Sequence, residues 1–112
     1  MKKKRLVVGI SGASGAILGF DLLRALREEP EWETHLIVST GAETTIAQAT
    51  KHSLQDVAAL ADMSYSFGNI GANVASGTFV TEGMVIVPCS MKTLAGIASG
   101  YSDNLLLRAA DV

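Results

Sequence analysis

Three apolar runs divide the chain into strand-like and helix-like segments. They occupy residues 5–10, 33–40 and 83–90, are rich in β-branched residues, and end in small polar residues. Pro88 ends the third run, because proline cannot donate to the hydrogen-bond ladder of a central strand. Continuous apolar runs of this length are typical of strands buried on both faces of a parallel sheet. The pattern therefore predicts three parallel strands.

The segment between the first two runs has helical spacing. Its apolar stripe consists of Ile17, Phe20, Leu22, Leu23 and Leu26. The charged residues gather late in the segment, and the proline at position 30 ends it. Strand, helix and strand in this order predict a βαβ unit.

Four further helices are predicted, over residues 41–53, 54–62, 90–101 and 104–112. Their starts carry residues that commonly cap helices, namely Ser53 (with Asp56 in the pattern of a capping box), Ser90 and Asp103.

Residues 63–83 have no strong helical period. Two short runs in this segment, "MSYSF" and "GTFV", are either edge strands or loop. Long irregular segments in compact domains are often functional, so this one is a candidate wall of a site. The whole pattern predicts an α/β fold with a three-layer, doubly wound, Rossmann-like parallel sheet. The last helix has no following strand, so we expect the sheet to be completed by another chain or by a longer protein.

The composition narrows the class of protein. The 112 residues are 48% hydrophobic and 18% charged, which is typical of a globular domain, and the net charge is −2. This balance predicts no general attraction to nucleic acid or to an anionic membrane. The single cysteine, Cys89, excludes an intrachain disulfide and fits a reducing cytosol. No apolar run approaches the length of a membrane span, so we expect a soluble cytoplasmic protein.

The stretch "VVGISGASGAILG", residues 7–19, is a candidate anion-binding loop. Its G-x-x-G-x-x-G spacing matches neither the Rossmann fingerprint nor the P-loop. The loop nevertheless joins a strand to a helix, whose first N–H groups and positive dipole end favour a phosphate. Ser11 and Ser14 add hydroxyl donors. The alternative is a tight turn whose glycines serve packing alone.

A second candidate loop, "PCSMKT", follows the third run. Ser90, Lys92 and Thr93 offer donors and one positive charge, and Ser39 ends the second run in the same way. Ligands of α/β sheets bind at the carboxyl ends of the strands, where these residues would meet. The rim would suit a phosphorylated aromatic ring system. Alternatively, each hydroxyl only caps a helix.

The sequence gives little support for a catalytic cysteine or a metal site. A catalytic Cys89 would need a histidine partner, and His35 lies within a predicted strand, where a satisfied structural histidine is the simpler interpretation. We expect Cys89 to pack at the edge of the ligand. Two histidines, one cysteine and no paired carboxylates predict no metal site. The residues alone thus indicate a binder of a phosphorylated cofactor and name no reaction.

Five blocks of the sequence carry a resemblance to a known family. They are "VGISGASGA", "ETHLIVS", "ASGTF", "GMVIVPCSMKTLAGIASGYSDNL" and "RAADV", in order over essentially the whole chain. In these blocks the chain resembles the UbiX-type flavin prenyltransferases, a family with phenolic acid decarboxylase-like members. The resemblance implies a flavodoxin-like sheet that binds FMN, no metal, and a homo-oligomer, a dodecamer in the full-length protein. It also implies transfer of a dimethylallyl group from dimethylallyl phosphate to reduced FMN, giving prenylated FMN for UbiD-type decarboxylases.

The resemblance also assigns site residues. It implies that FMN is bound by two loops and the serine between them: Gly12, Ala13, Ser14, Ser39, Ser90, Met91, Lys92 and Thr93. Ser14 is the implied catalytic residue, near flavin N5 and the prenyl phosphate. The segment Ala75, Ser76 and Gly77 is implied to lie near the prenyl donor.

Family members are longer, so residues 1–112 are expected to be one FMN-binding α/β domain that forms the amino-terminal part of a longer family domain. Two other functions stay open. One is that of the related flavin-dependent cysteine decarboxylases, although their "P-x-S-A-N-T" loop differs from "PCSMKT" here. The other is that of a non-catalytic FMN-binding subunit.

Overall fold

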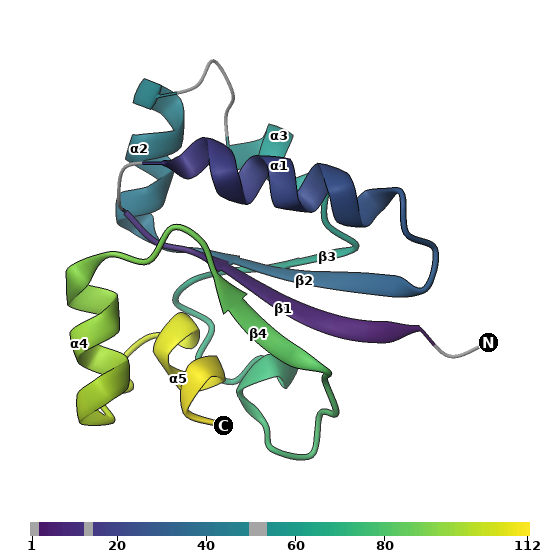
Figure 1. The fold of residues 1–112 in the computed structure, drawn as a ribbon. Coiled ribbons are helices and arrows are strands. Elements are labelled where there is room, and N and C mark those ends of the chain that lie inside the picture. The colour runs from purple at the N-terminus through teal and green to yellow at the C-terminus, as the bar shows by residue number, and fades with distance from the viewer. Residues whose placement is uncertain (1–2, 13–14, 50–53) are drawn as a thin grey trace.

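The fold is a parallel sheet with helices on both faces (Figure 1). The computed structural model of the chain describes residues 3–12, 15–49 and 54–112. Four strands pair in the order β3-β2-β1-β4, and all pairs are parallel. Their bounds are β1 (Lys4–Ile10), β2 (Trp32–Val38), β3 (Met63–Tyr65) and β4 (Gly83–Ile86). Because the strands are parallel, the loops after β1, β2 and β4 meet at one edge of the sheet.

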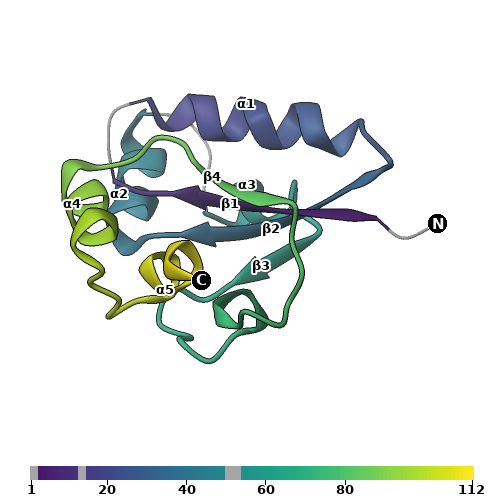
Figure 2. The same ribbon diagram turned by 60° about the horizontal axis from the view of Figure 1, so that its bottom comes forward.

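Helices cover both faces of the sheet, which confirms the three-layer α/β prediction (Figure 2). The first face is covered by α1 (Ala16–Arg27), α2 (Thr40–Ala49) and α3 (Leu54–Ala58). The second is covered by the 3-10 turn η1 (Asn73–Ala75) and by α5 (Leu105–Asp111). The helix α4 (Met91–Ser99) runs beside α5. None of the helices over the described residues is long and apolar enough to cross a membrane.

The core is divided by the sheet into two clusters, because side chains alternate between the faces of a strand. Val8 and Leu36 pack under α1 and α2, whereas Val7 and Ile37 pack against α5 and η1. All four side chains are buried. This pattern confirms that β1 and β2 are strands buried on both faces.

The prediction that the third apolar run is also buried on both faces is wrong. β4 ends at Ile86 and lies at the edge of the sheet, where Val85 is 38% exposed. The "MSYSF" run forms the opposite edge strand, β3, whereas "GTFV" lies in a turn before β4. Strand position in the sheet, rather than local hydrophobicity, decided these outcomes.

The predicted stripe of α1 is confirmed except at Ile17, because Phe20 and Leu23 are buried and the other two members, Leu22 and Leu26, are partly buried against the same core. Ile17 is 44% exposed, and the buried positions are Ala16, Gly19, Phe20 and Leu23. A Cβ on Gly19 would lie 2.5 Å from the carbonyl oxygen of Val87. The small residues therefore let α1 approach the backbone that follows β4.

The predicted helix caps have different outcomes. Ser90 is the N-cap of α4, as predicted, and its side chain accepts a hydrogen bond from the backbone N–H of Thr93. The predicted cap Asp103 is wrong, because Asn104 caps α5 by accepting from the N–H of Leu107 at 2.9 Å. The predicted capping box at Ser53 lies outside the described residues.

Candidate functional site

A pocket of about 610 Å³ opens at the carboxyl edge of the sheet. Its size is in the usual range for small-molecule and cofactor sites. The loops after β1, β2 and β4 contribute predicted site residues to its lining: Gly12, Ser39, Ser90, Lys92 and Thr93. The structure thus brings together three loops that are far apart in the sequence.

The glycine loop approaches α2 closely. A Cβ on Gly12 would lie 3.0 Å from the carbonyl carbon of Gly41, so a side chain at Gly12 would require the backbones to separate. Gly15 precedes α1 with φ of 90°, a left-handed conformation, and over the described residues no side chain caps this helix. Ala13 and Ser14, the other predicted residues of this loop, lie outside the described residues.

The loop before α4 is held by its own hydroxyl groups. Ser90 Oγ accepts from the N–H of Thr93 at 3.2 Å and donates to Thr93 Oγ1 at 3.0 Å. Among the described residues that line the pocket, Lys92 is the only one with a cationic side chain. The loop therefore offers one positive charge beside a structured helix start.

Ser39 caps the helix α2, which is one of the two roles that the sequence analysis left open for it. It is buried, and its Oγ accepts from the N–H of Ala42 at 3.1 Å, at the start of α2. The hydroxyl also lines the pocket, and a hydroxyl has a donor besides its acceptor sites. Capping and ligand contact are thus compatible at this residue.

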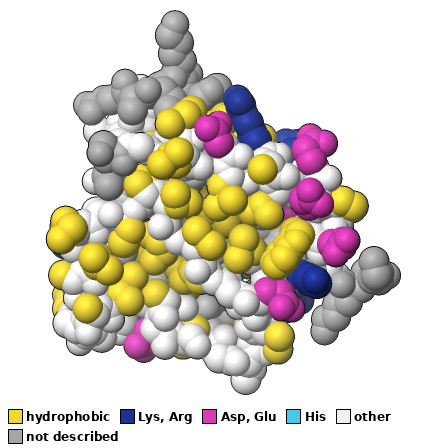
Figure 3. All heavy atoms as spheres, in the orientation of Figure 1, with side chains coloured by type: hydrophobic (Ala, Val, Ile, Leu, Met, Phe, Trp, Pro, Cys, Tyr) yellow, Lys and Arg dark blue, Asp and Glu magenta, His cyan; other side chains and the backbone are white. Residues whose placement is uncertain are grey.

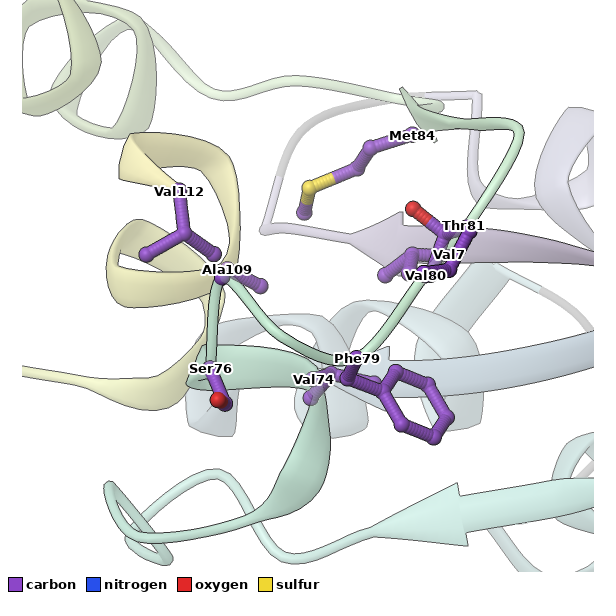
Figure 4. A pocket seen from close by; sticks show the side chains of 10 residues that line it. Val7, Val74, Ser76, Phe79, Val80, Thr81, Met84, Ala109 and Val112 are labelled. Carbon is purple, nitrogen blue, oxygen red and sulfur yellow. The ribbon is translucent and has the colours of Figure 1, made fainter.

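Other predicted residues lie elsewhere. Met91 is 79% exposed and is not among the residues that line the pocket. Ser76 and Gly77 line a separate pocket of about 280 Å³, between the loop after η1 and α5 (Figure 4). Ala75 packs against the cluster under α5. In this chain, the segment expected near the prenyl donor and the FMN loops therefore line different hollows.

The pocket has further lining residues, and one of them, Phe67, lies in the irregular segment 63–83 that the sequence predicts as a wall of a site. Phe67 and Leu107 supply apolar surface, and Tyr101 and Asp103 lie at the connection between α4 and α5. The Tyr101 hydroxyl donates to Asp103 at 3.1 Å, and this hydrogen bond raises the pKa of the tyrosine. The sequence assigned no pocket role to Tyr101, Asp103 or Leu107, because these residues meet the pocket only when α5 folds back along α4.

The remaining candidates are structural or exposed. His35 is 3% exposed, with Nδ1 2.8 Å from the Tyr65 hydroxyl and Nε2 2.6 Å from Glu33, which confirms a satisfied histidine. Burial is the main cause of the raised pKa of Tyr65. Cys89 is exposed and does not line the pocket. Over the described residues, no group of three or more His, Cys, Asp or Glu is placed to hold a metal ion.

A parallel α/β sheet with backbone amides, hydroxyls and one cation around a pocket at its strand ends defines a nucleotide- or flavin-binding class of domain. The model of the Flavoprotein family matches residues 1–112, and the chain belongs to this family. The matched range includes Gly12, Ser39 and Ser90, which line the pocket.

Curated relatives are similar along almost the whole chain. A probable UbiX-like flavin prenyltransferase from Sedimentibacter hydroxybenzoicus is 56% identical over 108 residues, 96% of this chain and 57% of the relative. The flavin prenyltransferase UbiX of Escherichia coli K12 is 55% identical over 109 residues, 97% of this chain and 58% of the relative. The chain thus spans somewhat more than half the length of these relatives.

Solved structures agree in fold. A dodecameric FMN-dependent UbiX-like decarboxylase from Escherichia coli O157:H7 has a TM-score of 0.94 and 56% identity, covering 96% of this chain and 58% of that one. The structure of AnUbiX (PadA1) in complex with FMN and dimethylallyl pyrophosphate has a TM-score of 0.95 and 47% identity. The match covers 98% of this chain and 58% of the AnUbiX chain. These likenesses confirm the flavodoxin-like α/β fold.

Proposed function

We propose that the pocket at the carboxyl edge of the sheet binds FMN. The observation that carries this proposal is the convergence of Gly12, Ser39, Ser90, Lys92 and Thr93 on one pocket. Backbone N–H groups at a helix start and hydroxyl donors suit a phosphate, and the apolar surface of Phe67 and Leu107 suits a ring system. The AnUbiX relative, 47% identical, was solved with FMN.

The protein is proposed to act as a flavin prenyltransferase, moving a dimethylallyl group from dimethylallyl phosphate to reduced FMN. When bound, reduced FMN supplies the nucleophilic ring atoms for this transfer. The chain's own residues hold the flavin at the strand ends, with Ser14 proposed as the catalytic residue. The resemblance supports Ala75, Ser76 and Gly77 as the segment near the prenyl donor, whereas in this chain Ser76 and Gly77 line a hollow separate from the FMN pocket. The product, prenylated FMN, would serve UbiD-type decarboxylases.

The protein is proposed to form a homo-oligomer in the cytoplasm. Hydrophobic side chains gather in a band across the face that shows α4, α5 and β4 (Figure 3). On α4, Met91 is 79% exposed and Leu94 is 52% exposed. Apolar patches of this kind often mark protein interfaces, and the UbiX-like structure from E. coli O157:H7 is dodecameric.

The first test is a fluorescence titration of the protein with FMN and, in parallel, with riboflavin, which lacks the phosphate. We expect saturable FMN binding and an affinity for riboflavin that is about 10- to 100-fold weaker, because charge-assisted hydrogen bonds to the phosphate are lost. Equal affinity for the two ligands would contradict the phosphate site. Absence of binding would contradict the FMN proposal for this chain.

The second test is for the reaction. Chemically reduced FMN and dimethylallyl phosphate are incubated with the protein, and the flavin is analysed by mass spectrometry for an added dimethylallyl group. Ser14→Ala is the matched variant, expected to bind FMN and to lose most adduct formation. FMN binding without any adduct in the unsubstituted protein would favour the non-catalytic FMN-binding function instead.

A further inference from the structure

Ser11 joins the two loops that form the flavin pocket. Ser11 is the first residue after β1, and it is only 1% exposed. The Ser11 Oγ accepts a hydrogen bond from the N–H of Ser90 at 2.6 Å and donates one to the carbonyl oxygen of Pro88 at 3.0 Å. The backbone N–H of Ser11 donates to the same carbonyl at 3.1 Å. Three hydrogen bonds thus connect one residue of the glycine loop to the loop before α4.

These bonds lie just beyond the end of the pairing between β1 and β4. The pairing of β1 with β4 extends to Gly9 and Ile86, and the N–H of Val87 still donates to the carbonyl of Gly9 at 2.9 Å. The pairing does not extend to Pro88, whose carbonyl oxygen instead accepts from both the N–H and the hydroxyl of Ser11. Ser11 resumes the connection beyond the proline and reaches Ser90, the N-cap of α4.

The connection continues into the pocket. The Ser90 backbone is held by Ser11, and the Ser90 hydroxyl in turn accepts from the N–H of Thr93. Ser90, Lys92 and Thr93 all line the pocket, whereas Ser11 does not. Ser11 can therefore affect ligand binding only indirectly, through the position of the loop that it holds.

This arrangement corrects the expectation from the sequence that the Ser11 hydroxyl is a donor to a bound anion. The hydroxyl hydrogen is directed to Pro88 and an oxygen lone pair to Ser90, and the side chain is almost fully buried. A hydroxyl suits this position because it is donor and acceptor at once. An alanine would leave the partly buried N–H of Ser90 without its partner, a costly loss.

We propose that Ser11 is a positioning residue for flavin binding, which sets the loop 88–93 against the glycine loop through the N–H of Ser90. The proposal rests on the proposed FMN site. Its consequence is that FMN affinity depends on a hydroxyl at position 11 that does not touch the ligand.

The test compares Ser11→Ala, Ser11→Thr and Ser11→Val. Thr and Val have nearly the same shape, so any overpacking by the added methyl affects both, and their difference isolates the hydroxyl. Because both hydrogen bonds of the Ser11 hydroxyl are lost and the N–H of Ser90 is left unpaired, we expect Ser11→Ala to bind FMN about 10- to 100-fold more weakly than wild type. For the same reason, Ser11→Val should bind FMN about 10- to 100-fold more weakly than Ser11→Thr. Equal affinities of the Thr and Val variants would overturn the proposal.

Two further measurements separate positioning from general destabilisation. Thr34→Ala removes the two partly buried hydrogen bonds between the Thr34 hydroxyl and Asp62, away from the pocket, and is expected to lower stability while leaving FMN affinity within about twofold. Amide hydrogen exchange in the ligand-free protein should become faster at Ser90 in Ser11→Ala, but not at Val87, whose partner is Gly9. Unchanged exchange at Ser90 would contradict the proposed connection.

The exchange measurement also distinguishes two failures. If the wild-type protein does not bind FMN but exchange at Ser90 responds to Ser11→Ala, the FMN site is wrong and the connection between the loops stands. If FMN binds and Ser11→Ala binds it as well as wild type, the FMN site stands and the role of Ser11 is wrong.

Discussion

The two helices that start at the site, α1 and α4, begin in different ways. Both follow parallel strands at the same edge of the sheet. The start of α1 is Gly15, in a left-handed conformation and without a side-chain cap over the described residues. The start of α4 is Ser90, in an extended conformation, and its side chain accepts from the N–H of Thr93. One helix start therefore has a donor satisfied by its own cap, and the other begins at a glycine, which has no side chain to offer.

The difference assigns separate roles to the two loops. An uncapped helix start leaves its first N–H groups for water or for a ligand, and these groups favour an anion. A capped start is structurally self-sufficient and offers its side chains instead, here Lys92 and Thr93. We therefore expect the glycine loop before α1 to contribute backbone groups to the pocket, at Gly12, and the start of α4 to contribute side chains.

The contact that brings the two helix starts together is tested by Gly19→Ala. The new Cβ would lie 2.5 Å from the Val87 carbonyl oxygen and 2.9 Å from Ile10 Cδ1, so α1 would have to move away from the backbone after β4. We expect a loss of about 3 kcal/mol in the free energy of unfolding, measured in urea. Gly41→Ala is the matched control, because its nearest atom is 3.8 Å away, and it should not lower stability. A loss at Gly41 equal to that at Gly19 would contradict the steric explanation.

The conformation of the uncapped start is tested by Gly15→Ala. A residue with a Cβ is strained at φ of 90°, and we expect stability to fall by about 1–2 kcal/mol, because the left-handed region is unfavourable for it. Gly15→Asn should lose less, since asparagine tolerates that region better. Urea unfolding of both variants provides the comparison, and equal losses would mean that packing rather than backbone conformation is responsible.

The capped start is tested by Ser90→Ala, with Asn104→Ala as its counterpart at α5. Each variant loses a side-chain acceptor for a first-turn N–H, and each should lose about 1 kcal/mol of stability. Asp103→Ala is the control at the neighbouring position, and should lose less than about 0.5 kcal/mol. A larger loss at Asp103 than at Asn104 would restore the cap that the sequence predicted.

The smallest effect concerns the pKa of Tyr101, which lines the pocket, and it is measured by alkaline titration. The chain has two tyrosines, so absorbance of the ligand-free Tyr65→Phe variant reports Tyr101 alone. The hydrogen bond to Asp103 raises the pKa of Tyr101 above 10.0, and Asp103→Asn should lower it towards that value. An unchanged titration would contradict the pair.

The sign of the effect on stability follows from the raised pKa. The folded protein holds the Tyr101 proton more tightly than the unfolded chain does. The contribution to stability is therefore complete below about pH 10 and is lost as the pH rises through the pKa of the folded protein.

Local signals predicted much of the fold and part of the site. β1, β2 and α1 follow from apolar periodicity and from the proline at position 30, and the Ser90 cap follows from side-chain chemistry within four residues. The loops after parallel strands were expected at one edge, and Ser39, Ser90 and Thr93 lie there. These predictions succeeded because each depends on short-range geometry or on a rule for parallel sheets. The roles of Ala13 and Ser14 stay predictions, because both lie outside the described residues.

The sequence by itself thus determined the strands β1 and β2 with the helix between them, the glycine turn before α1 and the family resemblance. Only the tertiary structure decided that β4 is an edge strand, that Ser11 holds Ser90, and that Tyr101 and Asp103 reach the pocket. It also placed Ser76 and Gly77 on a different hollow. The physical reason is that strand order and contacts between residues as distant as Ser11 and Ser90 depend on which buried surfaces meet. The local periodicity of the sequence does not specify which of these surfaces meet.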